Sequence, residues 1–141
     1  MRNEKQEMET KQYYFSARLA TSFEEAEKLT IEALKTEGFG VITEIDMQQK
    51  LKEKLNVDFK RYKILGACNP PLAYEALQAE EKIGTMLPCN VLIIEQEPGF
   101  TEVAAVNPVA SMQAVQNSGL MGAAGVVTEK LQRVIGSLSE K

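Results

Sequence analysis

Residues 63–71 read Lys63-Ile64-Leu65-Gly66-Ala67-Cys68-Asn69-Pro70-Pro71, and a shorter echo further along the chain reads Leu87-Pro88-Cys89-Asn90. Each stretch holds one of the two cysteines, followed by asparagine and flanked by proline. The apolar residues before Cys68 predict a strand, whereas Asn69 and Pro70 predict the cap and first position of a helix. The longer stretch therefore predicts a strand-to-helix connection with a thiol at the strand end.

Four further strands are predicted on either side of this connection. They are marked by aromatic and β-branched residues, by alternation, or by a continuous apolar run. Together with the strand before Cys68 the predicted strands are Lys11–Leu19, Gly40–Asp46, Phe59–Ala67, Asn90–Glu95 and Phe100–Val106. Pro98-Gly99 predicts a tight turn, so we expect the last two strands to form an antiparallel hairpin.

Helices are predicted where capping residues precede apolar positions at helical spacing. Ser22 caps the first helix, Gly38 ends it as a left-handed residue, and Asp46 caps a short second helix. Further helices are predicted after Asn69, after Asn107 and over Gly119–Leu138. The elements predict an α+β fold, an α/β two-layer arrangement in which a mixed five-stranded sheet carries helices mainly on one face.

Composition limits the classes of protein and of partner. A chain of 141 residues suits one domain, with a polar stretch over residues 1–10 as a disordered or extra N-terminal arm and a single domain over 11–141. The net charge of -4 gives no general attraction to nucleic acid or to an anionic membrane. Because there is neither a membrane-length apolar run nor a signal peptide, we expect a cytoplasmic protein.

The chain contains no histidine. This excludes a Ser-His-Asp or Cys-His triad, a His-ligated zinc site and an imidazole proton shuttle. Two thiols also fall short of the four ligands of a closed zinc site, so we expect no metal and no cofactor. Whether the chain is an enzyme stays open.

Several blocks of the sequence resemble the DUF302 family, a domain of unknown function. The most distinctive are Gly-Ala-Cys-Asn-Pro at residues 66–70 and Leu-Pro-Cys-Asn at residues 87–90, and the resemblance runs from about Tyr13 to the end. It implies a compact α/β fold, usually a homodimer, with no assigned activity. The small residues Gly119, Gly122 and Gly125 and the apolar run Val103–Val106 also favour a homodimer.

The two turns supply the candidate site. Its residues are Lys63, Cys68, Asn69, Pro70, Pro88, Cys89 and Asn90, and weaker candidates are Glu44, Asp46 and Tyr62. Because no catalytic constellation is present, the leading hypothesis is a small-molecule-binding or interaction module at these turns. One alternative is a thiol-dependent enzyme or redox sensor that uses Cys68, and another is a protein that handles soft metals.

The thiols also have a purely structural interpretation, because free cysteine is often a small buried hydrophobe. Strand direction bears on the choice. If the third and fourth strands are parallel, Cys68 and Cys89 lie at opposite sheet edges, about 15 Å apart, and cannot share a metal or a bond. Antiparallel pairing would bring them together.

Overall fold

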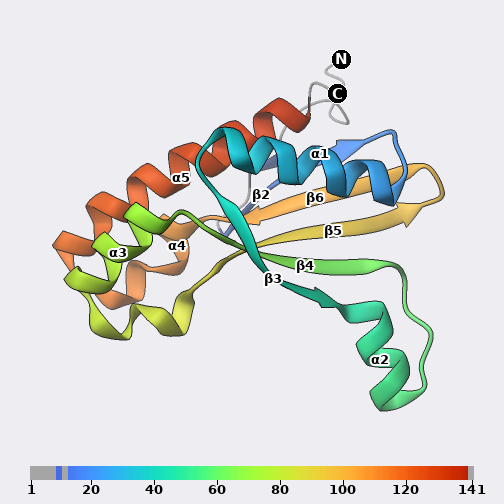
Figure 1. The fold of residues 1–141 in the computed structure, drawn as a ribbon, viewed down its shortest axis with the longest axis horizontal. Coiled ribbons are helices and arrows are strands. Elements are labelled where there is room, and N and C mark those ends of the chain that lie inside the picture. Colours follow the sequence, from blue (N-terminus) through green and yellow to red (C-terminus); the bar gives the residue numbers. More distant parts are fainter. Residues whose placement is uncertain (1–8, 11–12, 140–141) are drawn as a thin grey trace.

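Antiparallel strands form one layer of the molecule, and α1 (Phe23–Thr36) and α5 (Ser118–Leu138) lie on one face of it (Figure 1). The computed structural model describes residues 9–10 and 13–139. In spatial order the six described strands are β1 (Glu9–Thr10), β2 (Tyr14–Leu19), β6 (Phe100–Val106), β5 (Cys89–Glu97), β4 (Tyr62–Cys68) and β3 (Gly40–Asp46).

The predicted α+β class and its five strands are confirmed, with two differences, although residues 11–12 of the first predicted strand lie outside the described residues. Every pairing among the described strands is antiparallel, so the sheet is not mixed, and β1 adds a sixth strand. The strand direction reverses because α3 (Pro70–Ala79) and the 3-10 helix η2 (Glu81–Met86) bring the chain back into the sheet at the same end at which β4 leaves it. β5 therefore runs back beside β4.

The predicted N-terminal arm covers residues 1–10, of which 1–8 lie outside the described residues. Its last two residues form β1, which pairs antiparallel with β2. The single domain over residues 11–141 stays a prediction.

Local capping explains most of the helix boundaries. Ser22 Oγ accepts a hydrogen bond from the Glu25 N–H at 3.1 Å, and Asp46 Oδ1 caps α2 (Met47–Leu55) in the same way. Gly38 follows the C-cap residue Glu37 and has φ +87°, the left-handed conformation predicted for the glycine that ends this helix. Asparagine side chains accept hydrogen bonds at the start of α4 (Pro108–Ser111) and of α5.

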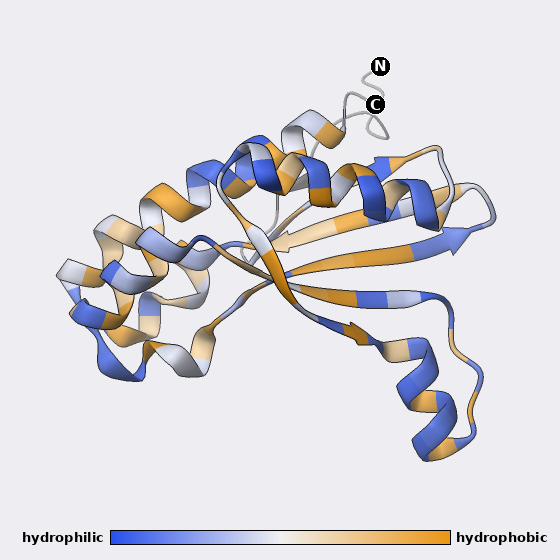
Figure 2. Ribbon diagram, in the orientation of Figure 1, coloured by the Kyte–Doolittle hydropathy of each residue, from blue (hydrophilic) through white to orange (hydrophobic). Residues whose placement is uncertain are grey.

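The main core lies between the sheet and the two helices that cover it. Leu34 of α1, Leu65 of β4, Val91 of β5 and both Leu131 and Ile135 of α5 are all fully buried there. Figure 2 shows the corresponding apolar strand segments converging at the centre of the sheet. Burial of these side chains is the main source of stability for this layer.

A second, smaller apolar cluster lies beyond the sheet edge, where α3, η2, α4 and the first half of α5 meet. It contains Ala76, Ile83, Met112, Leu120 and Ala124. The junction between this cluster and the main core contains the site described below.

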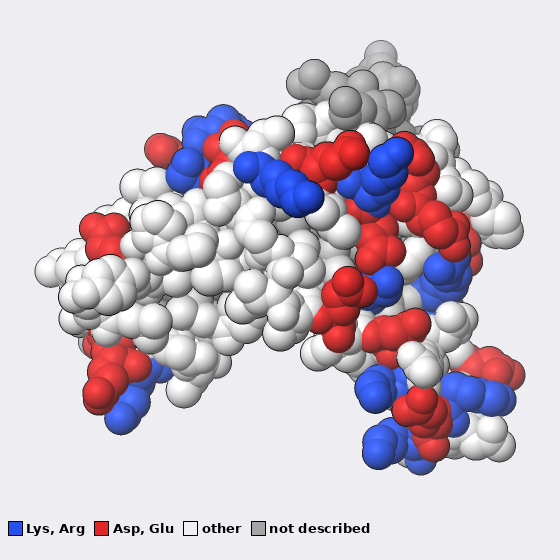
Figure 3. All heavy atoms as spheres, viewed as in Figure 1, with Lys and Arg blue, Asp and Glu red and all other residues white. Residues whose placement is uncertain are grey.

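Helix α2 projects from the opposite end of the molecule and buries none of its residues (Figure 1). Charged side chains of both signs gather over α1 and α2, whereas the surface between α3 and β3 is largely uncharged in the view of Figure 3. The mixed signs around Lys50, Lys52 and Glu53 fit an ordinary solvated surface.

Candidate functional site

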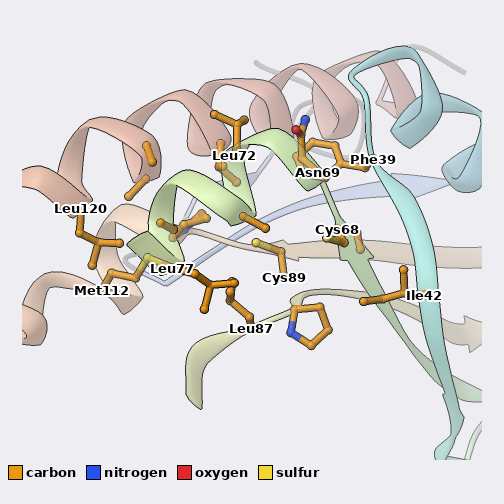
Figure 4. A pocket seen from close by; sticks show the side chains of 18 residues that line it. Phe39, Ile42, Cys68, Asn69, Leu72, Leu77, Leu87, Cys89, Met112 and Leu120 are labelled. Carbon is orange, nitrogen blue, oxygen red and sulfur yellow. The ribbon is translucent and has the colours of Figure 1, made fainter. Parts of the chain in front are cut away.

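An apolar cavity of about 280 Å³ lies where the ends of β4 and β5 meet α3, α4 and α5 (Figure 4). Both clusters of buried residues contribute to its wall. Its lining consists of Phe39, Ile42, Ala67, Cys68, Asn69, Leu72, Ala73, Ala76, Leu77, Leu87, Pro88, Cys89, Pro108, Met112, Leu120, Ala123, Ala124 and Val127.

The cavity has a buried floor and a more exposed mouth. Cys89, Met112 and Leu120 are buried, whereas Ile42 is 61% exposed and Leu77 is 43% exposed. The exposed members lie on β3 and α3, beside the uncharged surface seen in Figure 3. A ligand entering from this side would meet apolar side chains first.

Gly66 allows the chain to pack tightly next to the cavity. A Cβ atom at this position would lie 2.1 Å from Thr43 Oγ1 and 2.6 Å from Pro88 Cγ. Pro88 follows a cis peptide bond and lines the cavity. Pro88 and Thr43 of β3 both lie close to the β4 backbone at this position. Only glycine fits here, because any side chain would clash with them.

The antiparallel register brings both cysteines to the same end of the sheet, where β4 ends and β5 begins. Ala67 pairs with Cys89, so Cys68 comes directly after the paired position, and both cysteines line the cavity. Of the two strand arrangements that the sequence leaves open, the structure has the antiparallel one, which brings the two cysteines together. Both thiols are free, Cys89 being buried and Cys68 half-buried.

The electrostatic environment keeps Cys89 protonated. Burial, with a smaller effect from the neighbouring Cys68, raises the pKa of the Cys89 thiol to about 11. A thiol with this pKa carries almost no thiolate at neutral pH, so Cys89 acts as a small apolar group in the cavity floor.

Asn69 occupies the N-cap position of α3 but makes no side-chain cap. An N-cap side chain accepts a hydrogen bond from the N–H of the second or third helical residue, and Pro71 at the second position has no N–H to donate. The Asn69 side chain instead donates from Nδ2 to the carbonyl oxygen of Glu37, at 3.1 Å. The predicted cap is thus replaced by a tie between α3 and the end of α1.

The other sequence candidates lie outside the cavity. Lys63 bridges Glu27 of α1, at 2.9 Å, and Glu44 of β3, at 3.2 Å. Burial alone would lower the pKa of Lys63, but these two carboxylates raise it. Asp46 caps α2, and the rings of Tyr62 and Phe59 pack at 5.9 Å. Pro70 and Asn90 are exposed and do not line this cavity.

Most of the cavity lining was not predicted. Ala73, Ala76 and Leu77 carry only the ordinary signal of an amphipathic helix, and Met112 lies in a short segment without clear periodicity. Ala123 and Ala124 lie between Gly122 and Gly125, and the small size of their side chains is the one available signal. A small side chain on a covered helix face allows either a close contact with a neighbouring element or an empty space beside it. The sequence alone does not distinguish the two.

Among the described residues, no group of three or more Cys, Asp or Glu side chains is placed to hold a metal ion. No described helix is long and apolar enough to cross a membrane. None of the residues that line the cavity carries a formal charge. The site is therefore an uncharged, largely apolar space with one amide and two thiols in its wall.

Fold and site define a class of protein: a two-layer α+β chain with an open antiparallel sheet and an apolar cavity at the ends of two central strands. The sequence profile of DUF302, described as a domain of unknown function, matches residues 15–138. The chain belongs to the DUF302 family.

A solved structure supports this assignment. The chain is similar to an uncharacterized conserved DUF302 protein from Bacillus stearothermophilus, known from a crystal structure. The TM-score is 0.79 at 28% sequence identity, over 86% of this chain and 94% of that one. No curated protein matches the sequence.

Proposed function

We propose that this protein binds a small, neutral, apolar molecule in the cavity between α3, α5 and the ends of β4 and β5. The observation that carries the proposal is the composition of the wall, in which no side chain is charged. Burying an unpaired charge in such a space is costly, so charged ligands are disfavoured. Apolar pockets with a few polar groups are typical of small-molecule sites.

The cavity volume limits the size of the ligand. At roughly 30 Å³ for each atom of water size, 280 Å³ accommodates about ten non-hydrogen atoms. This corresponds to a bicyclic aromatic molecule or a short branched hydrocarbon. Larger ligands would have to extend through the mouth, past Ile42 and Leu77.

Benzofuran, which is neutral and of the right size, tests the proposal. We expect it to raise the melting temperature of the protein in a concentration-dependent way and to give a saturable calorimetric isotherm. Ala73→Phe places a ring at the cavity wall and should abolish binding. Glu75→Phe puts the same ring on an exposed position of α3 outside the cavity and should leave binding intact.

Absence of binding of both benzofuran and indole, an analogue of nearly the same shape with one N–H group, to the wild-type protein would contradict the proposal. Equal binding to wild type and Ala73→Phe would place the probe elsewhere and would also contradict it. A fold check by circular dichroism of both variants accompanies the measurement.

Thiol chemistry is the second candidate function. It is favoured by one specific observation, that Cys68, Cys89 and the thioether of Met112 all line the same cavity. Sulfur ligands of this kind suit Cu(I). Rapid labelling of Cys68 by iodoacetamide at pH 6.5 would support a thiol-dependent enzyme or redox sensor, and stoichiometric Cu(I) binding would support soft-metal handling.

We also propose that the chain forms a homodimer. Val103 and Ala105 are buried in the main core and lend an interface no support. Support comes from the sheet face opposite α1 and α5, where the register puts Ile45, Ile64 and Leu92 side by side.

Ile45 in this row is 42% exposed. Light scattering should therefore give twice the chain mass at micromolar concentration. Ile45→Glu should weaken the dimer, whereas Tyr74→Glu, on exposed α3, should not. A monomer mass for the wild type would contradict the proposal.

A further inference from the structure

We propose that the side-chain oxygen of Asn69 selects ligands that carry a hydrogen-bond donor, so that the cavity takes small apolar molecules with one N–H or O–H group. This inference rests on the proposed function and adds the chemical class of the ligand. Asn69 is 9% exposed and lines the cavity beside Phe39 (Figure 4).

The two halves of the Asn69 amide are used differently. Nδ2 donates to the Glu37 carbonyl oxygen, which fixes the orientation of the amide plane. Oδ1 makes no cap at the start of α3, and no hydrogen bond to it is formed by the described residues. The amide therefore presents a fixed acceptor with no partner in the described part of the chain.

The burial pattern indicates that this acceptor can be reached. Among the described residues, no fully buried side-chain nitrogen or oxygen lacks a hydrogen-bond partner. Because Oδ1 has none, it is not fully enclosed, although the residue as a whole is nine-tenths buried. Asn69 lines the cavity, so an acceptor that is not fully enclosed belongs to a residue of the cavity wall.

This geometry sets a penalty on the wrong ligand. A purely apolar molecule that displaces water from Oδ1 leaves a desolvated acceptor without a partner, whereas a ligand with a donor satisfies it. Sites built around a buried polar group reject the analogue that lacks the matching group. No carboxylate lines the cavity to balance an ammonium group, so the donor belongs to a neutral group such as an indole N–H or a phenol O–H.

Indole and benzofuran form a matched pair for the test, because they have nearly the same shape and only indole has an N–H group. Burying that N–H without a partner costs free energy, so a cavity lacking an acceptor should prefer benzofuran. We expect the wild-type protein to bind indole about five-fold more tightly than benzofuran, as measured by calorimetry. In Asn69→Leu the order should reverse.

Cys68→Ala is the control variant, because it alters the same wall and leaves Asn69 in place. It should keep the preference for indole. If the wild-type protein binds benzofuran as tightly as indole, the inference is wrong while the proposed function stands. If neither molecule binds, the proposed function fails and this inference with it. If Asn69→Leu does not fold, the ratio of indole to benzofuran affinity in the wild-type protein still tests the inference.

Discussion

The two buried clusters of this protein differ in how completely they are filled. Between the sheet and helices α1 and α5, large side chains such as Leu131 and Ile93 are fully buried in continuous packing. Beyond the sheet edge, the cluster around Met112 and Leu120 borders a cavity of about 280 Å³. Well-packed interiors contain few spaces larger than a water molecule, so an apolar space of this size marks the second region as the one suited to binding.

Helix α5 contributes to both regions and therefore allows a matched comparison. Leu131 and Leu120 are both fully buried leucines of α5, but only Leu120 lines the cavity. Leu131→Ala should lower the free energy of unfolding by about 3–4 kcal/mol, and Leu120→Ala by about 2 kcal/mol, because Leu120 already lacks packing partners on one side. Urea unfolding monitored by circular dichroism measures both. Equal losses would mean that the cavity is filled or collapsed in solution.

Gly66 lies where the main core reaches the cavity edge. Gly66→Ala should destabilise the protein by about 2–3 kcal/mol, because its Cβ atom would clash with Thr43 and Pro88. Gly136→Ala on α5 is the control: nothing lies within 4 Å of its Cβ position, so the substitution should stabilise the helix by up to about 1 kcal/mol. A neutral Gly66→Ala would show that Pro88 does not pack there.

Cys89 makes the stability of the cavity floor depend on pH. Its folded pKa, about 11, lies above the reference value of 9.0, so the unfolded chain releases this proton first as the pH rises. The stabilising contribution is therefore complete below about pH 9 and declines towards pH 11, by about 2 kcal/mol between pH 8 and 10.5. Urea unfolding should show this decline in the free energy of unfolding of the wild type. In Cys89→Ala the decline over the same pH range should be smaller by about 2 kcal/mol. Identical pH profiles would contradict the assigned burial.

Asn69 joins the two regions and should give the smallest of these effects. Asn69→Ala removes the hydrogen bond from Nδ2 to the Glu37 carbonyl and should cost about 1 kcal/mol. The loss reflects the tie between α3 and α1, since no helix cap is made there. Amide hydrogen exchange should therefore speed up near residues 37–40 as well as at the start of α3. Faster exchange in α3 alone would indicate a cap after all.

Local features of the sequence predicted the elements well. Ser22 and Asp46 make the expected caps, Gly38 has the expected left-handed conformation, and Phe100–Val106 is a strand with the predicted bounds. These features depend on residues a few positions apart, so the sequence contains their causes. The candidate site was predicted in part, since Cys68, Asn69, Pro88 and Cys89 line the cavity and Lys63, Pro70 and Asn90 do not.

The sequence by itself determined the α+β class, the strand-to-helix connection at Cys68 and the lack of histidine chemistry, because composition and short-range patterns are enough for these. Only the tertiary structure decided that β4 and β5 are antiparallel, that both thiols share one cavity, and that Asn69 binds Glu37. Each of these depends on segments far apart in the chain. A cavity is the space left between such segments, and no local pattern of residues encodes it.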